Sequence, residues 1–329
     1  MSKVLVLDEH IVTQLLTPAA CIEVMSEALM ALANGEVHQP LRAGVRPPGA
    51  AGLFGLMPAY RSAPIPLFAL KEVCVFPGNP ARGLDTHLGA VLLHSGETGE
   101  VLGIFNAAAI TAIRTAAVSA LATRLLSRAS SATLAIIGTG AQARAHLESI
   151  PLVRPIAAIR IAGRSQERAE RFVDQHRHVT SIRIEASPSV EEAVRGADIV
   201  VTATSSREPI LERDWVATGT HINAVGSSVA TSRELDGSTV AACSLYVDRR
   251  ESTINESGEY RSAIAEGAIT PDHIVGEIGE VMTGKVRGRE SDEEITLFKS
   301  LGLAIEDLAS AAWLYERATA LGVGSWVEL

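Results

Sequence analysis

The chain has 329 residues, of which 47% are hydrophobic and 20% are charged, and its formal net charge is −9. This balance is typical of a protein with one large domain or two smaller ones, and the excess of acid argues against a general nucleic-acid binder, which needs a basic surface. Aromatic residues contribute only 4%, so a base-stacking surface is not expected either.

The sequence predicts a cytoplasmic protein without a membrane span. No run of about 18 uncharged apolar residues is present, which is what a spanning helix needs. The apolar N-terminal run soon meets Asp8 and Glu9, so it lacks the longer apolar core of a signal peptide. Cys21, Cys74 and Cys243 lie far apart without a CxxC pair, which disfavours a disulfide framework and a zinc site. No metal is therefore predicted.

The first third of the chain predicts one helix followed by antiparallel strands. Residues 17–34 have a helical pattern, with Thr17 as its cap and Pro18 at its first position. Proline and glycine turns divide residues 40–80 into short apolar strands, and residues 89–106 have the pattern of a hairpin that turns at SGETGE.

One lysine stands inside an apolar strand of this region, in PLFALKEVCVFPGNP (residues 66–80). The chain has only four lysines, at positions 3, 71, 285 and 299, so Lys71 is an unusual choice here. It has two interpretations: an edge-strand lysine that discourages aggregation, or a cation that meets an anionic ligand.

Several arginines favour the anionic ligand. Arg42 and Arg46 in PLRAGVR would point to one face if that segment is a strand. Arg114 lies in a long apolar helix predicted for residues 107–128, where a buried guanidinium needs a carboxylate or an anionic ligand. Arginine and lysine converging on one point are what an α-carboxylate substrate requires.

From Ser130 onward, short apolar strands alternate with helices, which predicts a parallel sheet with helices on both faces. The last segment, from TLFKS to RATAL (residues 296–321), is predicted as one continuous helix that leaves this domain and packs on the first. We expect two domains with a cleft between them: residues 1–115 with 312–329, and residues 116–311.

A glycine motif opens the second domain. IIGTGAQA matches G-x-G-x-x-A at Gly138, Gly140 and Ala143, after a predicted strand and at the start of a helix. The first glycine allows a tight turn, the second lets the backbone approach a pyrophosphate, and the alanine permits close helix packing. The motif predicts a dinucleotide site; the alternative is a strand–helix turn without a ligand.

The next strand indicates which dinucleotide binds. It ends in AGRS, without the acid that holds a ribose 2′-hydroxyl in NAD sites. Arg164 would pair with a 2′-phosphate and Ser165 would donate to it, beside Gly163; alternatively Arg164 is a solvated loop residue. The sequence therefore favours NADPH over NADH.

Taken together, these motifs resemble the ornithine cyclodeaminase/mu-crystallin family over nearly the whole chain. The resemblance implies an α/β fold, with a Rossmann domain that binds NAD(P) and an antiparallel β-rich domain that binds substrate and forms a homodimer. The matching segments are PLR (40–42), MPAY (57–60), LKEVCVFPGNPARGLDTH (70–87), ITAIRTAAVSA (110–120), IIGTGAQARAH (136–146), ADIVVTAT (197–204), HINAVGS (221–227), RELD (233–236), EIGEV (277–281) and SDEEITLFKSLGLAIEDLA (291–309).

The resemblance also implies site residues. Arg42, Lys71 and Arg114 correspond to residues that gather the substrate carboxylate, and Lys71 and His87 are the candidate catalytic residues. With the glycine motif included, the predicted cofactor set is Thr86, His87, Arg114, Gly138, Thr139, Gly140, Ala141, Gln142, Gly163, Arg164, Ser165, Thr204, Ser205, Val225, Ser227 and Lys299.

One departure from the family pattern disfavours cyclodeamination among the possible reactions. Cyclodeaminases of the family have an aspartate shortly after NAVG, and here the matching position is Ser228. Serine cannot supply a carboxylate to a substrate ammonium group or act as an equivalent base. The mu-crystallin branch, which contains a ketimine reductase, also has serine there.

The resulting hypothesis is an NAD(P)H-dependent imine reductase that acts on a cyclic imino acid. Δ1-Pyrroline-2-carboxylate, reduced to L-proline, is the first candidate substrate, and Δ1-piperideine-2-carboxylate, reduced to L-pipecolate, is the second. Lys71, His87 or a water held by either would supply the proton. Ornithine cyclodeaminase, alanine or another imino-acid dehydrogenase, and a non-enzymatic NADPH-binding protein of the mu-crystallin type remain as alternatives.

Overall fold

The computed structural model describes residues 3–328, and the chain clusters into two compact units. The first unit runs to Arg114 and resumes at Leu303, and the second comprises Thr115–Gly302. The chain therefore returns to the first unit at Leu303 and not at the expected residue 312. The reason is that the last long helix packs against the first unit from its beginning, so its first turn already belongs there.

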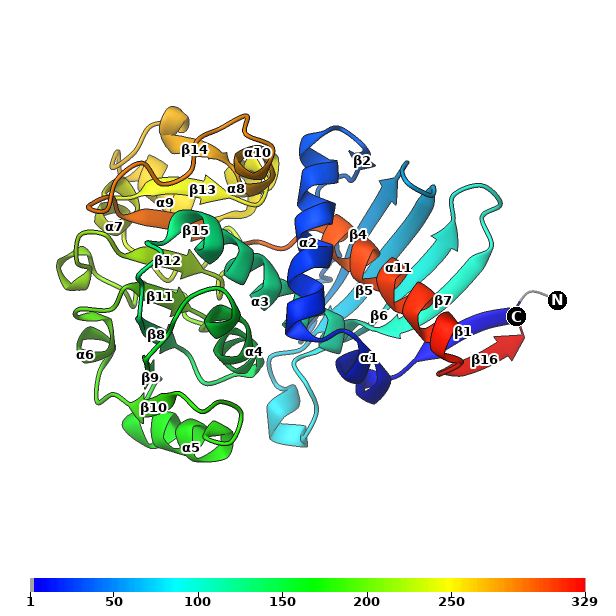
Figure 1. The fold of residues 1–329 in the computed structure, drawn as a ribbon, viewed down its shortest axis with the longest axis horizontal. Helices are drawn as coiled ribbons and strands as arrows, with labels where there is room; N and C mark the ends of the chain where they lie inside the picture. The colour runs from blue at the N-terminus through cyan, green and yellow to red at the C-terminus, as the bar shows by residue number, and fades with distance from the viewer. Residues whose placement is uncertain (1–2, 329) are drawn as a thin grey trace. The chain divides into compact units, whose positions relative to one another are not determined.

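The first unit is a mostly antiparallel sheet with helices packed on it (Figure 1). Its strands are β1 (Lys3–Leu7), β2 (Val37–His38), β3 (Ala43–Val45), β4 (Leu53–Arg61), β5 (Leu67–Val75), β6 (His87–Ser95), β7 (Val101–Asn106) and β16 (Ser325–Glu328). The sheet order is β16-β1-β7-β6-β5-β4-β2, β3 pairs with β4, and only β1 with β7 is parallel within this described sheet. The predicted hairpin of residues 89–106 is confirmed as β6 and β7.

Helices α1 (Glu9–Leu15), α2 (Pro18–Ala33) and α11 (Ala304–Leu321) belong to this unit. The Thr17 side chain accepts from the Ala20 amide and Pro18 occupies the first turn, which confirms the helix predicted there. Helix α11 lies on strands β4 to β7 and packs against α2 (Figure 1). Its first turn is held by Gln39, whose side-chain oxygen accepts from the Ile305 amide at 2.9 Å.

Strand β5 lies between β4 and β6, so it is not an edge strand. The edge-strand interpretation of Lys71 is therefore wrong. Alternation along the strand places Lys71 on the face covered by α11, while Phe68 on the other face remains 48% exposed.

The sequence predicts a strand that contains both Arg42 and Arg46, and the strand in the structure is too short to include either. Only Ala43–Val45 pairs with β4, and both arginines lie just outside the paired residues. Pro47 and Pro48 follow at once, and a proline nitrogen has no hydrogen to donate to a neighbouring strand. Arg42 is partly exposed and Arg46 is exposed.

The second unit is a fully parallel sheet, as predicted. Its strands are β8 (Thr133–Ile137), β9 (Ala158–Ala162), β10 (Arg183–Ala186), β11 (Ile199–Thr202), β12 (His221–Ala224), β13 (Ser244–Val247), β14 (Ile274–Glu277) and β15 (Thr296–Lys299), in the order β10-β9-β8-β11-β12-β15-β13-β14. Its helices are α3 (Ala107–Leu126), which crosses from the first unit, α4 (Ala141–Ser149), α5 (Gln166–His176), α6 (Val190–Val194), α7 (Gly237–Ala241), α8 (Arg250–Glu256), α9 (Gly258–Ala265) and α10 (Ile278–Met282).

The strand order reverses beside β8. The chain runs outward from β8 to β9 and β10, and then returns to β11 on the other side of β8. Because parallel crossovers are right-handed, α4 and α5 cover one face of the sheet and α6 the other. All carboxyl ends of the strands meet at one edge, where ligands bind at such a reversal.

The continuous helix expected for residues 296–321 is wrong. Residues Thr296–Lys299 form β15, buried between β12 and β13, and α11 begins only at Ala304. Gly302 between them has φ of 82°, a conformation that a helix cannot contain. The apolar residues of this segment suit a strand and a helix equally well, so their pattern did not separate the two.

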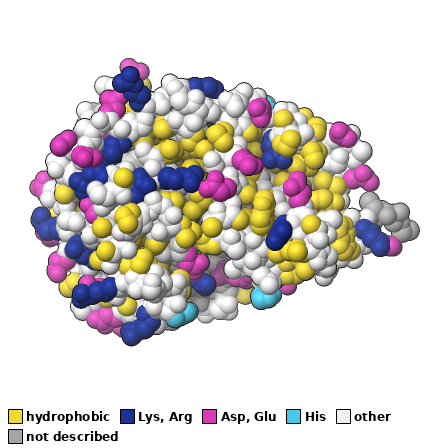
Figure 2. Space-filling view, in the orientation of Figure 1, with side chains coloured by type: hydrophobic (Ala, Val, Ile, Leu, Met, Phe, Trp, Pro, Cys, Tyr) yellow, Lys and Arg dark blue, Asp and Glu magenta, His cyan; other side chains and the backbone are white. Residues whose placement is uncertain are grey.

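Helix α3 is long and apolar enough to span a membrane by length and composition, and most of it is buried inside the protein, as is usual for a core helix. Among residues 3–328, the bent pair α1 and α2 passes the same test only when counted together. Figure 2 shows basic and acidic side chains interspersed over the face that it draws. Cys21, Cys74 and Cys243 are free cysteines.

Candidate active site

Two of the predicted substrate residues meet in the first unit. Lys71 on β5 forms an ion pair with Asp307, with 2.7 Å between Nζ and Oδ2. Arg114 on α3 donates to the same carboxylate from Nε, at 3.3 Å, and to Glu306 from Nη1, at 2.7 Å. We call these four side chains the ion cluster.

The ion cluster is almost fully enclosed: the exposed fractions are 3% for Lys71, 4% for Arg114, 0% for Glu306 and 1% for Asp307. Buried charges are retained only when they are paired. Desolvation lowers the pKa of Lys71 to about 8, against the opposing attraction of Asp307. The pKa of Arg114 is raised because the attraction of Asp307 and Glu306 outweighs its own desolvation.

The expectation that Arg114 needs an acidic partner is confirmed, and both of its partners were missed. Glu306 and Asp307 lie in the first turn of α11, where the helix dipole favours negative charge. Two adjacent acids in the apolar segment AIEDLASAA were the available signal. Nothing in the local pattern indicates that Arg114, the partner of both acids, lies 192 and 193 positions before them.

The third nitrogen of the Arg114 guanidinium, Nη2, is not bound by the two acids. The acids take Nε and Nη1, and within residues 3–328 no hydrogen bond to Nη2 is formed. Lys71 has a second, longer contact, 3.4 Å from Nζ to the Thr111 hydroxyl. A carboxylate that approached Nη2 would add a partner to a cation whose orientation is already fixed.

The remaining first-unit candidates lie outside the ion cluster. His87 begins β6 and is exposed, yet its pKa is lowered, first by partial desolvation and then by repulsion from the Lys71 ammonium. Thr86 is partly exposed, and its carbonyl accepts from the Phe76 amide at 2.9 Å. Arg42 is partly exposed before β3. The structure thus groups Lys71 and Arg114, couples His87 to them electrostatically, and leaves their roles as predictions.

The glycine motif in the second unit has the geometry of a dinucleotide loop. Gly138 has φ of 138°, and a side chain there would come within 2.4 Å of the Ala203 carbonyl oxygen. Gly140 is the N-cap of α4 without a side-chain cap, and a side chain there would meet nothing within 4 Å. The first-turn amides of α4, beside Thr139 and Ala141, are therefore open to an anion.

The loop after β9 carries the predicted 2′-phosphate residues. Arg164 and Ser165 are exposed, and the Ser165 oxygen caps α5 by accepting from the Arg168 amide at 3.4 Å. An accepting hydroxyl retains its own hydrogen, so this cap leaves Ser165 able to donate. Gly163 lies close to the glycine motif, because a side chain there would come within 3.0 Å of Thr139.

The loops after β11 and β12 are tied together by one buried acid that sequence reasoning missed, Glu234 of the RELD segment. Its carboxylate accepts from the Thr204 amide and hydroxyl, both at 2.7 Å, and from the Gly226 amide at 2.8 Å. Desolvation raises its pKa, against the attraction of Lys299. This network fixes Thr204 and Val225; Ser205 is exposed and Ser228 is partly exposed in the same loops.

Lys299, at the end of β15, is 1% exposed and bound inside the second unit. Its ammonium donates to the Ser227 carbonyl at 2.5 Å and pairs with Glu259 at 3.1 Å. A cofactor contact by Lys299 remains a prediction, while its visible effect is to hold the loop that contains Ser227.

The predicted cofactor residues of the second unit follow five strands, β8, β9, β11, β12 and β15, at their carboxyl ends. Because these strands are parallel, all of the loops lie at one edge of the sheet. The open amides after Gly140 and the space around it fit a pyrophosphate. The residues present therefore fit a nicotinamide dinucleotide.

Comparisons with known proteins agree with this geometry. The chain is 39% identical to ketimine reductase mu-crystallin of Mus musculus over 283 residues, 86% of each chain. It is similar to the structure of Thermococcus litoralis Δ1-pyrroline-2-carboxylate reductase in complex with NADH and L-proline, with a TM-score of 0.94, 37% identity and coverage of 98% of this chain and 100% of that one. It is also similar to an archaeal alanine dehydrogenase dimer with bound NAD, with a TM-score of 0.93, 34% identity and full coverage of both chains. Since the model of the ornithine cyclodeaminase/mu-crystallin family matches residues 2–322, the chain belongs to that family.

Proposed function

We propose that this chain is a nicotinamide-dependent imine reductase that acts on a cyclic imino acid. Δ1-Pyrroline-2-carboxylate is the first candidate substrate, and Δ1-piperideine-2-carboxylate the second. The observation that carries the proposal is the pair of buried cations, Lys71 and Arg114, whose acids leave Nη2 of Arg114 for a substrate carboxylate. The relatives named as ketimine and pyrroline-2-carboxylate reductases support the same substrate class.

Reduction of the imine adds a hydride to the carbon of the C=N bond and a proton to its nitrogen, giving the amine. The bound nicotinamide, in its reduced form, supplies the hydride. The chain's own residues bind and orient the substrate: Arg114 and Lys71 hold the carboxylate, with Arg42 as a third predicted contact. Lys71, whose pKa of about 8 lies near neutrality, is suited to hold and release a proton.

Ser228 directs the proposal toward reduction and away from cyclodeamination. It is partly exposed in the loop after β12 and presents a hydroxyl where cyclodeaminases of the family have a carboxylate. A hydroxyl cannot balance the charge of a substrate ammonium group. The ammonium group of an ornithine-like substrate would therefore have no carboxylate partner at this position. A neutral or resonance-stabilised imine does not need one.

The test is to mix the full chain with Δ1-pyrroline-2-carboxylate and either NADPH or NADH, and to follow loss of cofactor absorbance together with proline formation. We expect oxidation of one cofactor per proline. A parallel reaction with ornithine and NAD⁺ is followed for proline and ammonia. The proposal is contradicted if ornithine is cyclodeaminated while Δ1-pyrroline-2-carboxylate causes no cofactor oxidation. A third reaction contains pyruvate and ammonia, which form an open-chain imine; cofactor oxidation in this reaction only supports an open-chain substrate instead.

We propose NADPH as the preferred cofactor. The loop after β9 offers Arg164 and Ser165 without an acid, a set that suits a phosphate better than a hydroxyl. Solved relatives contain NADH or NAD, so the general expectation from the family is a nicotinamide cofactor of either kind. The preference is measured as the ratio of kcat/KM for the two cofactors in the assay above.

We also propose that the chain forms a homodimer through the outer face of the first-unit sheet, the face opposite α11. Phe68 and Leu88 on this face are 48% and 41% exposed, and Phe68 packs against Tyr60 with ring centroids 4.7 Å apart. A hollow of about 480 Å³ lies here, lined mainly by apolar side chains of β4 and β5. Exposed apolar patches mark interaction surfaces, and a similar solved relative is a dimer.

A further inference from the structure

Asp307 contacts both cations of the ion cluster. One carboxylate oxygen lies 2.7 Å from Lys71 Nζ and the other lies 3.3 Å from Arg114 Nε. Its neighbour Glu306 lies 2.7 Å from Arg114 Nη1. Asp307 therefore joins Lys71 on a strand to Arg114 on a helix through one carboxylate, and its contact with Lys71 is shorter than the 3.4 Å between Lys71 and the Thr111 hydroxyl on the same helix.

From this geometry we propose that Asp307 is the positioning residue of the imine-reduction site: it sets the distance between Lys71 and Arg114 and directs both cations at one substrate carboxylate. The inference rests on the proposed function, because the carboxylate ligand comes from that proposal. Asp307 itself acts through the two cations and is not assigned a contact with the substrate.

The rigidity of its support suits Asp307 for this role. It lies in the first turn of α11, where Gln39 accepts from the Ile305 amide and so holds the backbone in place. Lys71 has four rotatable side-chain bonds, and an ammonium on so flexible a stem is placed only by a partner. A loss of about 1 Å in placement costs about 100-fold in rate.

Charge balance gives Asp307 a second effect. Lys71 and Arg114 contribute two positive charges to the ion cluster, and Glu306 and Asp307 contribute two negative charges, all of them buried. A ligand with a carboxylate alone would bring an unbalanced negative charge into this enclosure, which is costly. A protonated imino acid, or the amino acid product, is a zwitterion and adds no net charge. The two acids should therefore favour zwitterions over simple carboxylates.

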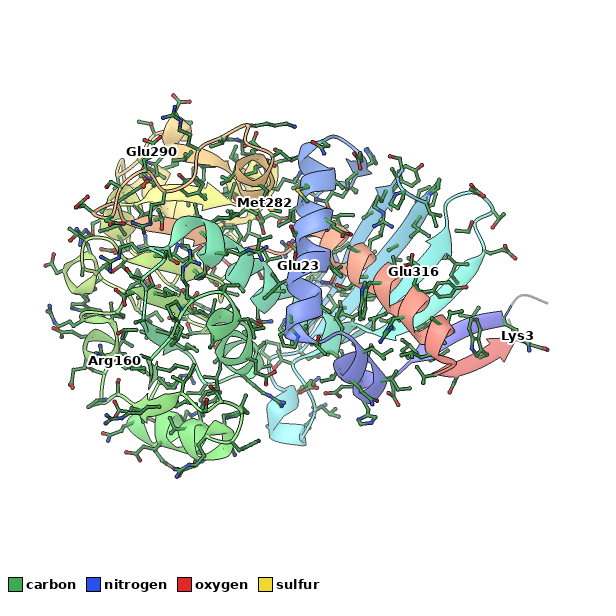
Figure 3. The ribbon with its side chains drawn as sticks, viewed as in Figure 1. Lys3, Glu23, Arg160, Met282, Glu290 and Glu316 are labelled. Atoms are coloured by element: carbon green, nitrogen blue, oxygen red, sulfur yellow. The ribbon has the colours of Figure 1, made fainter. Side chains whose placement is uncertain are left out.

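The first test follows the proton of Lys71 directly and needs no turnover. With four lysines in the chain, ¹³C-lysine labelling gives four side-chain signals, and Lys71→Met assigns the one that matters. Lys3 (Figure 3) and Lys285 are exposed, and Lys299 belongs to the second unit, so they serve as internal references. We expect Lys71 to titrate near 8, and Asp307→Asn to move this midpoint downward, because desolvation stays while the attraction is lost.

The matched control is Glu306→Gln, which removes the other buried acid but not the partner of Lys71. Its effect on the Lys71 midpoint should be smaller, since attraction by Glu306 is the weakest contribution to that pKa. Asp307→Glu restores the charge and should restore part of the shift. A Lys71 midpoint that is unchanged in a folded Asp307→Asn variant, or changed equally by Glu306→Gln, overturns the inference.

The second test uses binding and kinetics. The affinities of L-proline, a zwitterion, and of cyclopentanecarboxylate, which has no amine, are compared with oxidised cofactor present. Wild type should bind L-proline more tightly. Asp307→Asn should reduce the ratio of the two affinities about tenfold, the effect of one charge in a partly shielded site. In the imine assay, Asp307→Asn should lower kcat about 100-fold. In the Lys71→Met background its effect should be smaller, because only the contact with Arg114 is then left to lose.

An additive double variant, or an unchanged binding ratio, counts against a role through Lys71. If wild type shows no imine reduction, the proposed function fails, while the lysine titration and the binding ratio still decide the role of Asp307. Circular dichroism and the melting temperature establish that each variant compared is folded. If Asp307→Asn does not fold, Asp307→Glu carries both tests, because it moves the carboxylate by one methylene without removing its charge.

Discussion

At the scale of single residues, the ion cluster explains why a strand and a helix of the first unit carry charges inside their apolar packing. Lys71 and Arg114 are each matched by a carboxylate of α11, and the enclosure leaves almost none of the four side chains in water. Removing one partner of such a pair costs about 3–5 kcal/mol, whereas an intact pair adds little net stability. An ion cluster of this kind adds little to the stability of the fold, and the role proposed for it is to bind the substrate carboxylate.

Lys71 can be tested for its two roles, binding a carboxylate and donating a proton, with two substitutions. Lys71→Met removes both, and we expect kcat/KM to fall about 10³-fold, as for loss of a positioned acid. Lys71→Arg keeps the positive charge but releases no proton near neutral pH. If Lys71 is the donor, Lys71→Arg should retain KM and lose kcat; retained kcat assigns the proton to His87 or to water.

The pH dependence follows from the same residue. The pKa of Lys71 is lowered from 10.5 to about 8, so the ammonium is present below about 8 and is lost as the pH rises through that value. The kcat/KM of wild type should therefore fall above pH 8, and in Lys71→Arg this fall should disappear. Cofactor affinity, measured by fluorescence titration, should be nearly equal in wild type, Lys71→Met and Lys71→Arg. If a Lys71 variant loses cofactor affinity, the substitution has disturbed the structure beyond the ion cluster.

Arg164 is the residue on which the NADPH preference depends. A hydrogen bond to a charged group contributes about 1.5–3 kcal/mol, so Arg164→Met should raise the KM for NADPH about 10-fold to 100-fold. The KM for NADH should change little, because that cofactor has no 2′-phosphate. Arg168→Met on the neighbouring helix α5 is the control, since Arg168 is also exposed. Equal losses for both cofactors would show that Arg164 does not recognise the phosphate.

At the scale of elements, the turn between β8 and α4 contains two glycines with different constraints. A side chain on Gly138 would collide with the Ala203 carbonyl, and its φ of 138° is one that other residues rarely adopt. Gly138→Ala should therefore cost about 1–3 kcal/mol of folding stability and lower the melting temperature. Gly140 has open space around it, so Gly140→Ala should leave the melting temperature nearly unchanged.

Cofactor binding separates the two variants further. If a pyrophosphate approaches the backbone at Gly140, an added methyl group would obstruct it, and Gly140→Ala should lose affinity without losing stability. Isothermal titration with NADPH and NADH measures this. Unaltered affinity in Gly140→Ala would mean that the loop is only a strand–helix turn, which is the alternative that the motif alone leaves open.

The helices and strands also show which parts of the fold can be predicted from the local sequence pattern. The buried parallel strands β8, β9, β11 and β12 were predictable, because such strands are short continuous apolar runs between helices. Strand β15 was not, because its apolar residues continue into α11 and only Gly302 separates them. The ion cluster was half predictable: Arg114 required an acid, but pairing with Asp307 depends on how distant elements pack, which periodicity does not encode.

At the scale of the whole molecule, the candidate substrate residues and the candidate cofactor loop belong to different units of the chain. The first unit holds the ion cluster, and the second holds the glycine loop and its neighbouring strand ends. Helix α3 is shared, since it brings Arg114 to the first unit and continues into the second. The proposed function gives the carboxylate to the first unit and the hydride-supplying cofactor to the second, so variants in one unit should spare the binding property of the other.

The proposed homodimer is tested at Phe68, the most exposed aromatic side chain of the outer sheet face, which lies on β5 between β4 and β6. Phe68→Asp would place a charge in an apolar contact, where an unpaired carboxylate is strongly disfavoured. Light scattering should then show a shift from dimer to monomer at micromolar concentration. Leu152→Asp is the matched control, because Leu152 is 54% exposed but belongs to the second unit and not to this sheet.

The melting temperature of Phe68→Asp should fall with dilution less than that of wild type, because a dimer gains stability from association and a monomer does not. If Phe68→Asp remains a dimer while Leu152→Asp becomes a monomer, the interface lies on the second unit and the outer face has another use. A wild-type chain that is monomeric at all concentrations removes the proposal altogether. A dimer lost only in Phe68→Asp places a second copy of the chain on the side of β5 opposite Lys71.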